Sequence, residues 1–103
     1  MKNIVILISG RGSNMQAIVN AAIPDVCIAA VLSNSATAAG LAWAADRGIA
    51  TDSLNHKDFP SRLSFDQAMM EKIDAYQPDL VVLAGFMRIL TPAFCAHYEG
   101  RLI

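Results

Sequence analysis

The sequence has almost no excess of charge of either sign, because eight Lys and Arg residues stand against nine Asp and Glu residues for a net charge of −1. This balance gives no electrostatic reason to expect a nucleic acid or an anionic membrane as a partner. Long apolar runs are also missing, and no stretch approaches the roughly 18 apolar residues that span a bilayer. The apolar run near the N-terminus is followed by glycines and an arginine, not by the small-residue cleavage site of a signal peptide. We expect a cytoplasmic protein that acts on small molecules.

Cysteine is scarce, and Cys27 and Cys95 are far apart without the spacing of metal ligands. We predict two reduced, mostly buried thiols and no metal site. The histidines give no stronger signal: His56 lies in a polar loop and is expected to be solvated. His97, near the end of a helix, is expected to be a cap or a surface residue. The acidic residues form no convincing pair, so no residue of this chain is assigned to catalysis.

Apolar residues, by contrast, make up 54% of the 103 residues, although so short a chain has an unfavourable ratio of surface to volume. The chain therefore either buries both faces of a sheet or lacks a partner that covers apolar surface. Residues 4–8, 28–32 and 80–83 are continuous runs dominated by Val, Ile and Leu, which are typical of strands buried on both faces of a parallel sheet. The more polar residues 50–54 suit an edge strand.

Segments with helical spacing fill the gaps between these strands. At the start of the first, Ser13 stands in capping-box spacing with Gln16, where Ser13 would be the N-cap. The second runs from about residue 38 and ends at Arg47 and Gly48, and the fourth begins at Thr91 and Pro92. Apolar stripes on the first and third helices are predicted to consist of Met15, Ile18, Val19 and Ala22, and of Phe65, Met69, Ile73 and Tyr76.

This order of elements predicts an α/β fold in which residues 1–103 form a single domain around a doubly wound parallel sheet. We expect the domain to be truncated after the start of a fifth strand, because a new apolar run begins at Leu102 and stops at Ile103. Such a fragment would leave a sheet edge and apolar faces exposed. We therefore expect it to self-associate or to be marginally stable.

A glycine turn, Ser9-Gly10-Arg11-Gly12-Ser13-Asn14, follows the first predicted strand. Its two glycines allow backbone angles closed to other residues and let a ligand approach the main chain. The amides of Gly12, Ser13 and Asn14 would be unpaired donors at the N-terminus of the first helix, where the helix dipole also favours an anion. The guanidinium of Arg11 adds positively charged hydrogen-bond donors. The turn therefore predicts a phosphate site, although the glycines would also suit a simple tight turn.

Two features of a dinucleotide-binding fingerprint are missing from this turn. The third glycine is replaced by Met15, and residues 33–35 are Ser-Asn-Ser where an acid would hold a ribose diol. A lysine with the spacing of a P-loop is also missing. These differences favour a single phosphate over a pyrophosphate.

The loop after the fourth predicted strand, residues 85–90, carries four apolar residues, Phe86, Met87, Ile89 and Leu90. With the strand order 3-2-1-4, this loop faces the glycine turn across the crevice where doubly wound sheets bind ligands. A flat heterocycle lying in this segment would explain the apolar side chains. They could equally fill a core. Arg88 could meet a carboxylate or pack elsewhere.

At these two loops the sequence closely resembles the folate-dependent glycinamide ribonucleotide formyltransferases of purine synthesis. "SGRGSN" matches their S-G-x-G-S-N signature, and "PDLVVLAGFMRIL", residues 78–90, matches the strand and loop that hold the pterin ring of the folate. "ATDSL" and "GRLI" stand in matching order, so the resemblance covers the whole chain. It implies a Rossmann-like formyltransferase fold and formyl transfer from 10-formyltetrahydrofolate to the amine of glycinamide ribonucleotide.

The resemblance also implies roles for individual residues. The ribose phosphate of the substrate would be bound by Arg11, Gly12, Ser13 and Asn14. The folate would be bound by Arg62, which meets its glutamate end, and by the pterin-pocket residues Met87, Arg88, Ile89 and Leu90. The catalytic Asn, His and Asp of the family have no counterpart in the 103 residues, so the chain is expected to bind ligands and to be inactive alone.

Two other functions remain open at this point. One is an NAD-type dinucleotide-binding oxidoreductase domain, which the replacement of the third glycine and of the acid disfavours. The other is a non-catalytic nucleotide-binding module, which the unfinished fifth strand disfavours.

Overall fold

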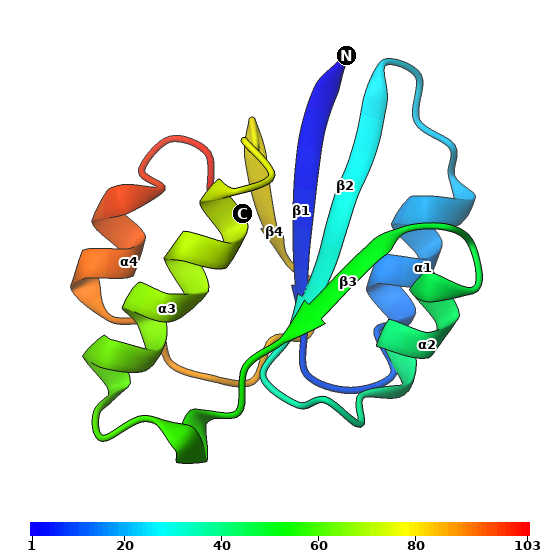
Figure 1. Cartoon of the computed structure of the whole chain (residues 1–103). Coiled ribbons are helices and arrows are strands. Elements are labelled where there is room, and N and C mark those ends of the chain that lie inside the picture. The colour runs from blue at the N-terminus through cyan, green and yellow to red at the C-terminus, as the bar shows by residue number, and fades with distance from the viewer.

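The computed structural model describes all 103 residues, Met1–Ile103. Its four strands form one parallel sheet in the order β3-β2-β1-β4, which confirms the predicted order (Figure 1). The strands are β1 (Lys2–Ile8), β2 (Val26–Ser33), β3 (Ala50–Ser53) and β4 (Leu80–Leu83). The short, more polar β3 lies at the edge of the sheet, as expected from its composition.

The last three residues add a short fifth row to the sheet beside β4. Leu102 forms a parallel bridge with Val81, and the amide of Ile103 donates to the carbonyl of Val81 at 3.0 Å. The amide of Val81 in turn donates to the carbonyl of Arg101 at 2.7 Å. The apolar run predicted at Leu102 therefore does pair with the sheet.

Two helices cover each face of the sheet. The helices α1 (Ser13–Asn20) and α2 (Ala39–Ala45) lie on one face, and α3 (Arg62–Asp74) and α4 (Pro92–His97) lie on the other (Figure 1). A single 3-10 turn, η1 (His56–Asp58), connects β3 to α3. This arrangement is the predicted doubly wound α/β fold. No helix of the structure is long and apolar enough to cross a membrane.

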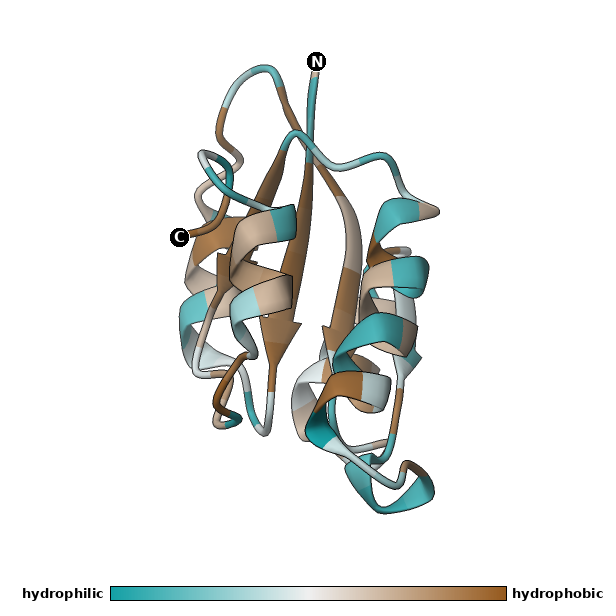
Figure 2. Cartoon of the chain, turned by 90° about the vertical axis from the view of Figure 1, so that its left-hand side faces the viewer, coloured by the Kyte–Doolittle hydropathy of each residue, from teal (hydrophilic) through white to brown (hydrophobic).

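The central strand β1 is buried on both faces, which explains its continuous apolar sequence. Val5 and Leu7 belong to the core under α3 and α4, whereas Ile4, Ile6 and Ile8 belong to the core under α1 and α2. All five are at most 6% exposed. Figure 2 shows the same arrangement from the side, with apolar strands between two layers of helices. Each face of the sheet thus has its own apolar core.

The first helix begins differently from the prediction. Gly12 is its N-cap and has a left-handed backbone, with φ 69° and ψ 42°, so Ser13 is already the first helical residue and forms no capping box with Gln16. The predicted apolar stripe is also only partly buried: Met15 is buried, while Ala22 lies beyond the helix and is exposed. The prediction of a serine cap was wrong because the N-cap has a left-handed backbone, which glycine adopts more readily than serine.

The other helix ends agree with the prediction. The side chain of Thr91 accepts a hydrogen bond from the amide of Phe94, and Pro92 is the first residue of α4. Gly48, after α2, has φ 76°.

The prediction that both thiols are mostly buried was wrong for Cys95. Cys95 is exposed, because it lies on the solvent side of the short helix α4, and Cys27 is half-buried.

Candidate functional site

The glycine turn, residues 9–14, connects β1 to α1 at the carboxyl edge of the sheet. None of the backbone hydrogen bonds outside helices and strands uses the amide of Gly12, Ser13 or Asn14 as donor, and the first amides of a helix have no acceptor within it. Because Ser13 does not cap the helix, its hydroxyl is also free to contact a ligand. The turn is held instead by Gln16, whose side-chain amide donates to the carbonyl of Arg11 at 3.2 Å.

The two glycines of the turn have different roles. Gly12 needs its left-handed backbone, and a Cβ atom there would lie 3.0 Å from the Cε of Met15. Gly10 has no positive φ and no atom within 4 Å of the position of a Cβ. The expectation that both glycines are needed for their backbone angles is therefore wrong for Gly10. At that position the missing side chain only leaves open space in front of the main chain.

A third glycine, which the sequence analysis missed, supports the turn from behind. Gly40, in the first turn of α2, donates its amide hydrogen to the carbonyl of Gly10 at 3.0 Å. A Cβ atom on Gly40 would lie 2.8 Å from the carbonyl oxygen of Arg11 and would overlap Ile8. The signal in the sequence was a glycine inside a helical pattern. Glycine lowers the stability of a helix, so its presence there suggests a packing reason, such as the close approach of another backbone.

The turn faces the loop that follows β4 across a cavity of about 410 Å³, the glycine-turn cavity. One hydrogen bond joins these walls, because the hydroxyl of Ser9 accepts from the amide of Met87 at 2.7 Å. Next to it, the amide of Ala84 donates to the carbonyl of Leu7 in β1 at 2.9 Å. The cavity lies where the sequence analysis placed it, between the loops after β1 and β4. Its lining residues are Ser9, Gly10, Arg11, Gly12, Ser13, Asn14, Ala84, Gly85 and Met87.

All four residues predicted to bind the substrate phosphate, Arg11, Gly12, Ser13 and Asn14, therefore line one cavity. Arg11 is its only charged lining residue. The cavity combines unpaired amides, a hydroxyl, a guanidinium and the N-terminus of α1, and these groups favour an oxyanion. It contains no carboxylate, imidazole or thiol that could exchange a proton with a substrate.

The residues predicted to bind the folate are more dispersed. Of the four loop residues predicted to bind the folate, only Met87 lines the glycine-turn cavity, and it is 80% exposed. Ile89 is 71% exposed, whereas Leu90 packs against the core under α3 and α4. Arg62 is an exposed residue at the start of α3 and does not line the cavity. Part of the loop thus fills core, as one interpretation of the sequence expected, and part of it is exposed.

Arg88 points back toward α3. Its guanidinium carbon lies 4.9 Å from the centre of the Phe65 ring, and its Nε atom is buried without a hydrogen-bond partner in the protein. Beside Phe65, the buried carboxylate of Asp66 accepts a hydrogen bond from the amide of Thr91 at 2.8 Å. Asp66 therefore fixes the end of the loop on α3. This role of Asp66 was not predicted from the sequence, although a charged residue next to an apolar stripe was a signal for it.

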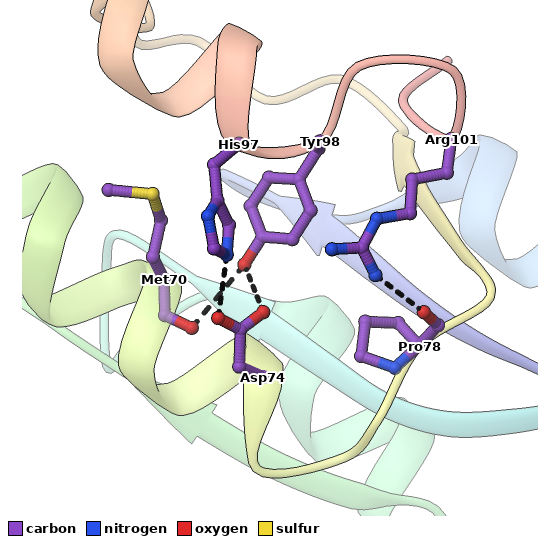
Figure 3. Close-up of polar contacts among 6 residues, drawn as sticks. All are labelled: Met70, Asp74, Pro78, His97, Tyr98 and Arg101. Atoms are coloured by element: carbon purple, nitrogen blue, oxygen red, sulfur yellow. Dashed lines mark hydrogen bonds and ion pairs between the residues drawn. The ribbon is translucent and has the colours of Figure 1, made fainter.

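A polar network on the opposite edge of the sheet joins α3 to α4 (Figure 3). Asp74 accepts from the Tyr98 hydroxyl at 2.8 Å, and its other oxygen lies 2.7 Å from the Nε2 of His97. Burial, and then the hydrogen bond with Asp74, raise the pKa of the Tyr98 hydroxyl. Arg101 lies over the Tyr98 ring and donates to the carbonyl of Pro78. His97 is thus a partly exposed surface residue in a structural contact, as predicted, far from the glycine turn.

Comparison with known proteins identifies relatives of this chain. The profile of the family described as formyl transferase matches residues 2–103. The chain belongs to the formyl transferase family. Phosphoribosylglycinamide formyltransferase of Escherichia coli is 53% identical over 98% of this chain and 49% of its own length. The enzyme of the same name from Haemophilus influenzae is 40% identical over the whole chain and 50% of its own length. The chain therefore spans about half the length of these curated relatives.

Solved structures support the same assignment to the formyl transferase family. A phosphoribosylglycinamide formyltransferase from Coxiella burnetii has a TM-score of 0.93 and 48% identity over 98% of this chain and 49% of its own. One from Brucella melitensis has a TM-score of 0.93 and 45% identity over 98% of this chain and 54% of its own. The fold described above is thus the formyltransferase fold.

Proposed function

We propose that the protein carrying this chain transfers a formyl group from 10-formyltetrahydrofolate to the amine of glycinamide ribonucleotide in purine biosynthesis, in the cytoplasm. The observation that carries this proposal is the glycine-turn cavity, in which unpaired amides of Gly12, Ser13 and Asn14 lie beside Arg11. The names of the formyl transferase relatives supply the substrate and the reaction. The family match also favours formyl transfer over an NAD-type oxidoreductase or a non-catalytic nucleotide module.

The ribose phosphate of the substrate would lie on the glycine turn. Its oxygens would accept hydrogen bonds from the amides of Gly12, Ser13 and Asn14 and from the hydroxyl of Ser13, while Arg11 would balance part of the charge. Gly10 also lines the cavity, and a Cβ atom there would have no protein atom within 4 Å, so the main chain is open at this position. The turn is thus built for close approach to the main chain.

The folate would lie against the loop that follows β4. Met87 and Ile89 offer exposed apolar surface for a flat ring, and the unpartnered Nε atom of Arg88 is a donor available nearby. The hydrogen bond between Ser9 and Met87 holds this loop at a fixed distance from the phosphate site. Leu90 would support the loop from the core side, and the exposed Arg62 would meet the glutamate carboxylate of the folate.

The reaction requires the substrate amine to attack the formyl carbon and to lose a proton, with the breaking of the bond to folate N10. Donors are needed for the oxyanion of the tetrahedral intermediate, and a positioned acid or base must move the proton. Because the glycine-turn cavity contains no proton-exchanging side chain, we assign binding and orientation to this chain and catalysis to none of its residues. Holding the two reactants together is itself a large part of such catalysis.

A formyl-transfer assay on the full-length protein tests this proposal. We expect formylation of glycinamide ribonucleotide with 10-formyltetrahydrofolate as donor. The variant Arg11→Gln should raise the KM for the ribonucleotide by about fivefold, the equivalent of roughly 1 kcal/mol for one exposed charge contact. Arg47→Gln is the matched control, because Arg47 is exposed and stacks on Trp43 of α2. Formylation of a different amine, with none of glycinamide ribonucleotide, would contradict the proposal.

We also propose that the 103-residue chain self-associates through its exposed apolar side chains. Met87, Ile89 and Ile103 are between 69% and 80% exposed. Burying such side chains against a second copy would remove apolar area from water. Size-exclusion chromatography with light scattering should therefore show a mass above 11.0 kDa that rises with concentration. A dilute, stable monomer would count against this part of the proposal.

A further inference from the structure

The side chains of the loop that follows β4 alternate between the outside and the inside of the molecule. Residues 85, 87 and 89 are exposed, whereas residues 86, 88 and 90 are half-buried. No backbone hydrogen bond outside the helices and strands involves residues 85–90. Because no backbone ladder holds this loop, its position depends on contacts with the side chains of other elements.

Two neighbouring residues of α3 hold the second half of the loop. The guanidinium carbon of Arg88 lies 4.9 Å from the centre of the Phe65 ring. One residue further along α3, the carboxylate of Asp66 accepts from the amide of Thr91 at 2.8 Å. The first half is held by the glycine turn, through the hydrogen bond from the amide of Met87. The loop is therefore fixed at both ends, by two different elements.

Asp66 is the contact that needs an explanation, because its carboxylate is buried. It is 2% exposed, and no other charged residue of the structure is buried. It belongs to neither of the two ion pairs, and the amide of Thr91 is the one hydrogen-bond donor to its side chain. Burying a carboxylate with so few partners costs free energy. The charge is offset only at the end of the loop, where a charge-assisted bond is roughly twice as strong as a neutral one.

The bond at Thr91 also determines where the exposed side chains of the loop lie. Only three residues separate Thr91 from Met87, so the stretch that carries the exposed Ile89 is short and held at both ends. Between them, Leu90 packs against the core under α3 and α4. Release of Thr91 would leave this stretch attached to the glycine turn at one end only.

We propose that Asp66 is a positioning residue for the binding of the folate, an inference that rests on the proposed function. Its carboxylate holds the amide of Thr91 and so keeps the exposed side chains of Met87 and Ile89 where the folate ring packs on them. Asp66 lies outside the glycine-turn cavity and acts through the loop. Without this bond, fewer molecules have the loop in the binding position, and the apparent affinity for the folate falls in proportion.

The same bond also has a structural role, because Thr91 begins the next helix. Its hydroxyl caps α4 by accepting from the amide of Phe94. A separate contact between α3 and α4 is made by the Tyr98 hydroxyl, which donates to Asp74 at 2.8 Å. Tyr98→Phe removes that contact without touching the loop. It therefore serves as the matched control for a loss of stability between the same two helices.

Steady-state kinetics of the full-length protein test the proposal, with 10-formyltetrahydrofolate and glycinamide ribonucleotide varied separately. Asp66→Ala and Asp66→Leu both remove the acceptor, the first leaving space and the second filling it, so that one remains if the other fails to fold. In each we expect the KM for the folate to rise about fivefold, with kcat and the KM for the ribonucleotide nearly unchanged. Asp66→Asn keeps an acceptor oxygen and should restore the KM for the folate to within about twofold. Tyr98→Phe should lower the Tm and change neither KM.

The outcomes separate this inference from the proposed function. An unsubstituted protein that does not formylate glycinamide ribonucleotide would overturn the proposed function, and this inference with it. With an active unsubstituted protein, an unchanged KM for the folate in the Ala and Leu variants of Asp66 would overturn the inference alone. Equal rises in both KM values, an equal rise in Tyr98→Phe, or no recovery in Asp66→Asn would also overturn it, because each would leave Asp66 without a specific effect on the folate.

Discussion

The substitution Gly40→Ala offers a test of how the glycine turn is supported. By helix propensity alone, replacing a glycine inside α2 with alanine should stabilise the protein by about 1 kcal/mol. The structure predicts the opposite sign. A Cβ atom on Gly40 would lie 2.8 Å from the carbonyl oxygen of Arg11, closer than van der Waals contact allows, and would also overlap Ile8. Overpacking of this kind costs typically 1–3 kcal/mol, so we expect a net loss of about 1 kcal/mol.

Thermal unfolding followed by circular dichroism measures this loss. For a domain of about 100 residues, 1 kcal/mol corresponds to a fall in Tm of roughly 4–8 °C. Gly10→Ala is the matched control, because no atom lies within 4 Å of the position of its Cβ, and its Tm should be nearly unchanged. If Gly40→Ala raised the Tm instead, helix propensity would dominate and the proposed contact between α2 and the turn would be refuted.

Three further predictions follow from the same structure. Gly12→Ala should lose roughly 1–2 kcal/mol of stability in urea unfolding, because its φ is 69° and L-residues avoid that conformation; an unchanged midpoint would show that the turn can relax. Partial burial acts to raise the pKa of Asp52, but hydrogen bonds from Lys72 and a backbone amide, with the charge of Lys72, outweigh it and lower the pKa below 3.8. The stability from this carboxylate is thus present above pH 3.8 and is lost as the pH falls through the lowered value. Asp52→Asn should cost less than about 1 kcal/mol at pH 7 and progressively less below pH 3.8, and an equal cost across this range would contradict the assignment. Ser9→Ala should remove the bond to Met87 and weaken folate binding in calorimetry, whereas Ser9→Thr should largely restore it; equal losses would deny the hydroxyl a role.

Much of the fold could be predicted because strands buried on both faces require continuous runs of apolar residues. Both faces of β1 are buried, so Ile4 through Ile8 must all be apolar, and no helix-type spacing competes with that pattern. The cap of α4 was equally readable, because Thr91 and Pro92 each have a local physical reason for their position.

The start of α1 could not be predicted in the same way. Ser13 and Gln16 have the spacing of a capping box, but the left-handed backbone of Gly12 shifts the start of the helix by one residue. The sequence pattern describes which side chains could pair, and the backbone conformation decides which of them do. The shift has a consequence for the site, because it leaves the Ser13 hydroxyl free.

The cavity at the glycine turn was predictable, whereas the contacts that support it were not. Arg11 to Asn14 are consecutive in sequence, so their common cavity follows from the turn alone. The contact of Gly40 with Gly10 and the partial burial of His56, which was expected to be solvated, depend on how distant loops approach one another. Such contacts leave only weak signals in a single sequence.

The glycine turn is proposed to bind the phosphate of glycinamide ribonucleotide. The most direct test is a backbone amide NMR titration of the 103-residue chain with glycinamide ribonucleotide and NAD as separate ligands. The structure predicts saturable shifts of the Gly12, Ser13 and Asn14 amides with the ribonucleotide and none with NAD. Shifts with NAD and none with the ribonucleotide would contradict the account in favour of a dinucleotide site.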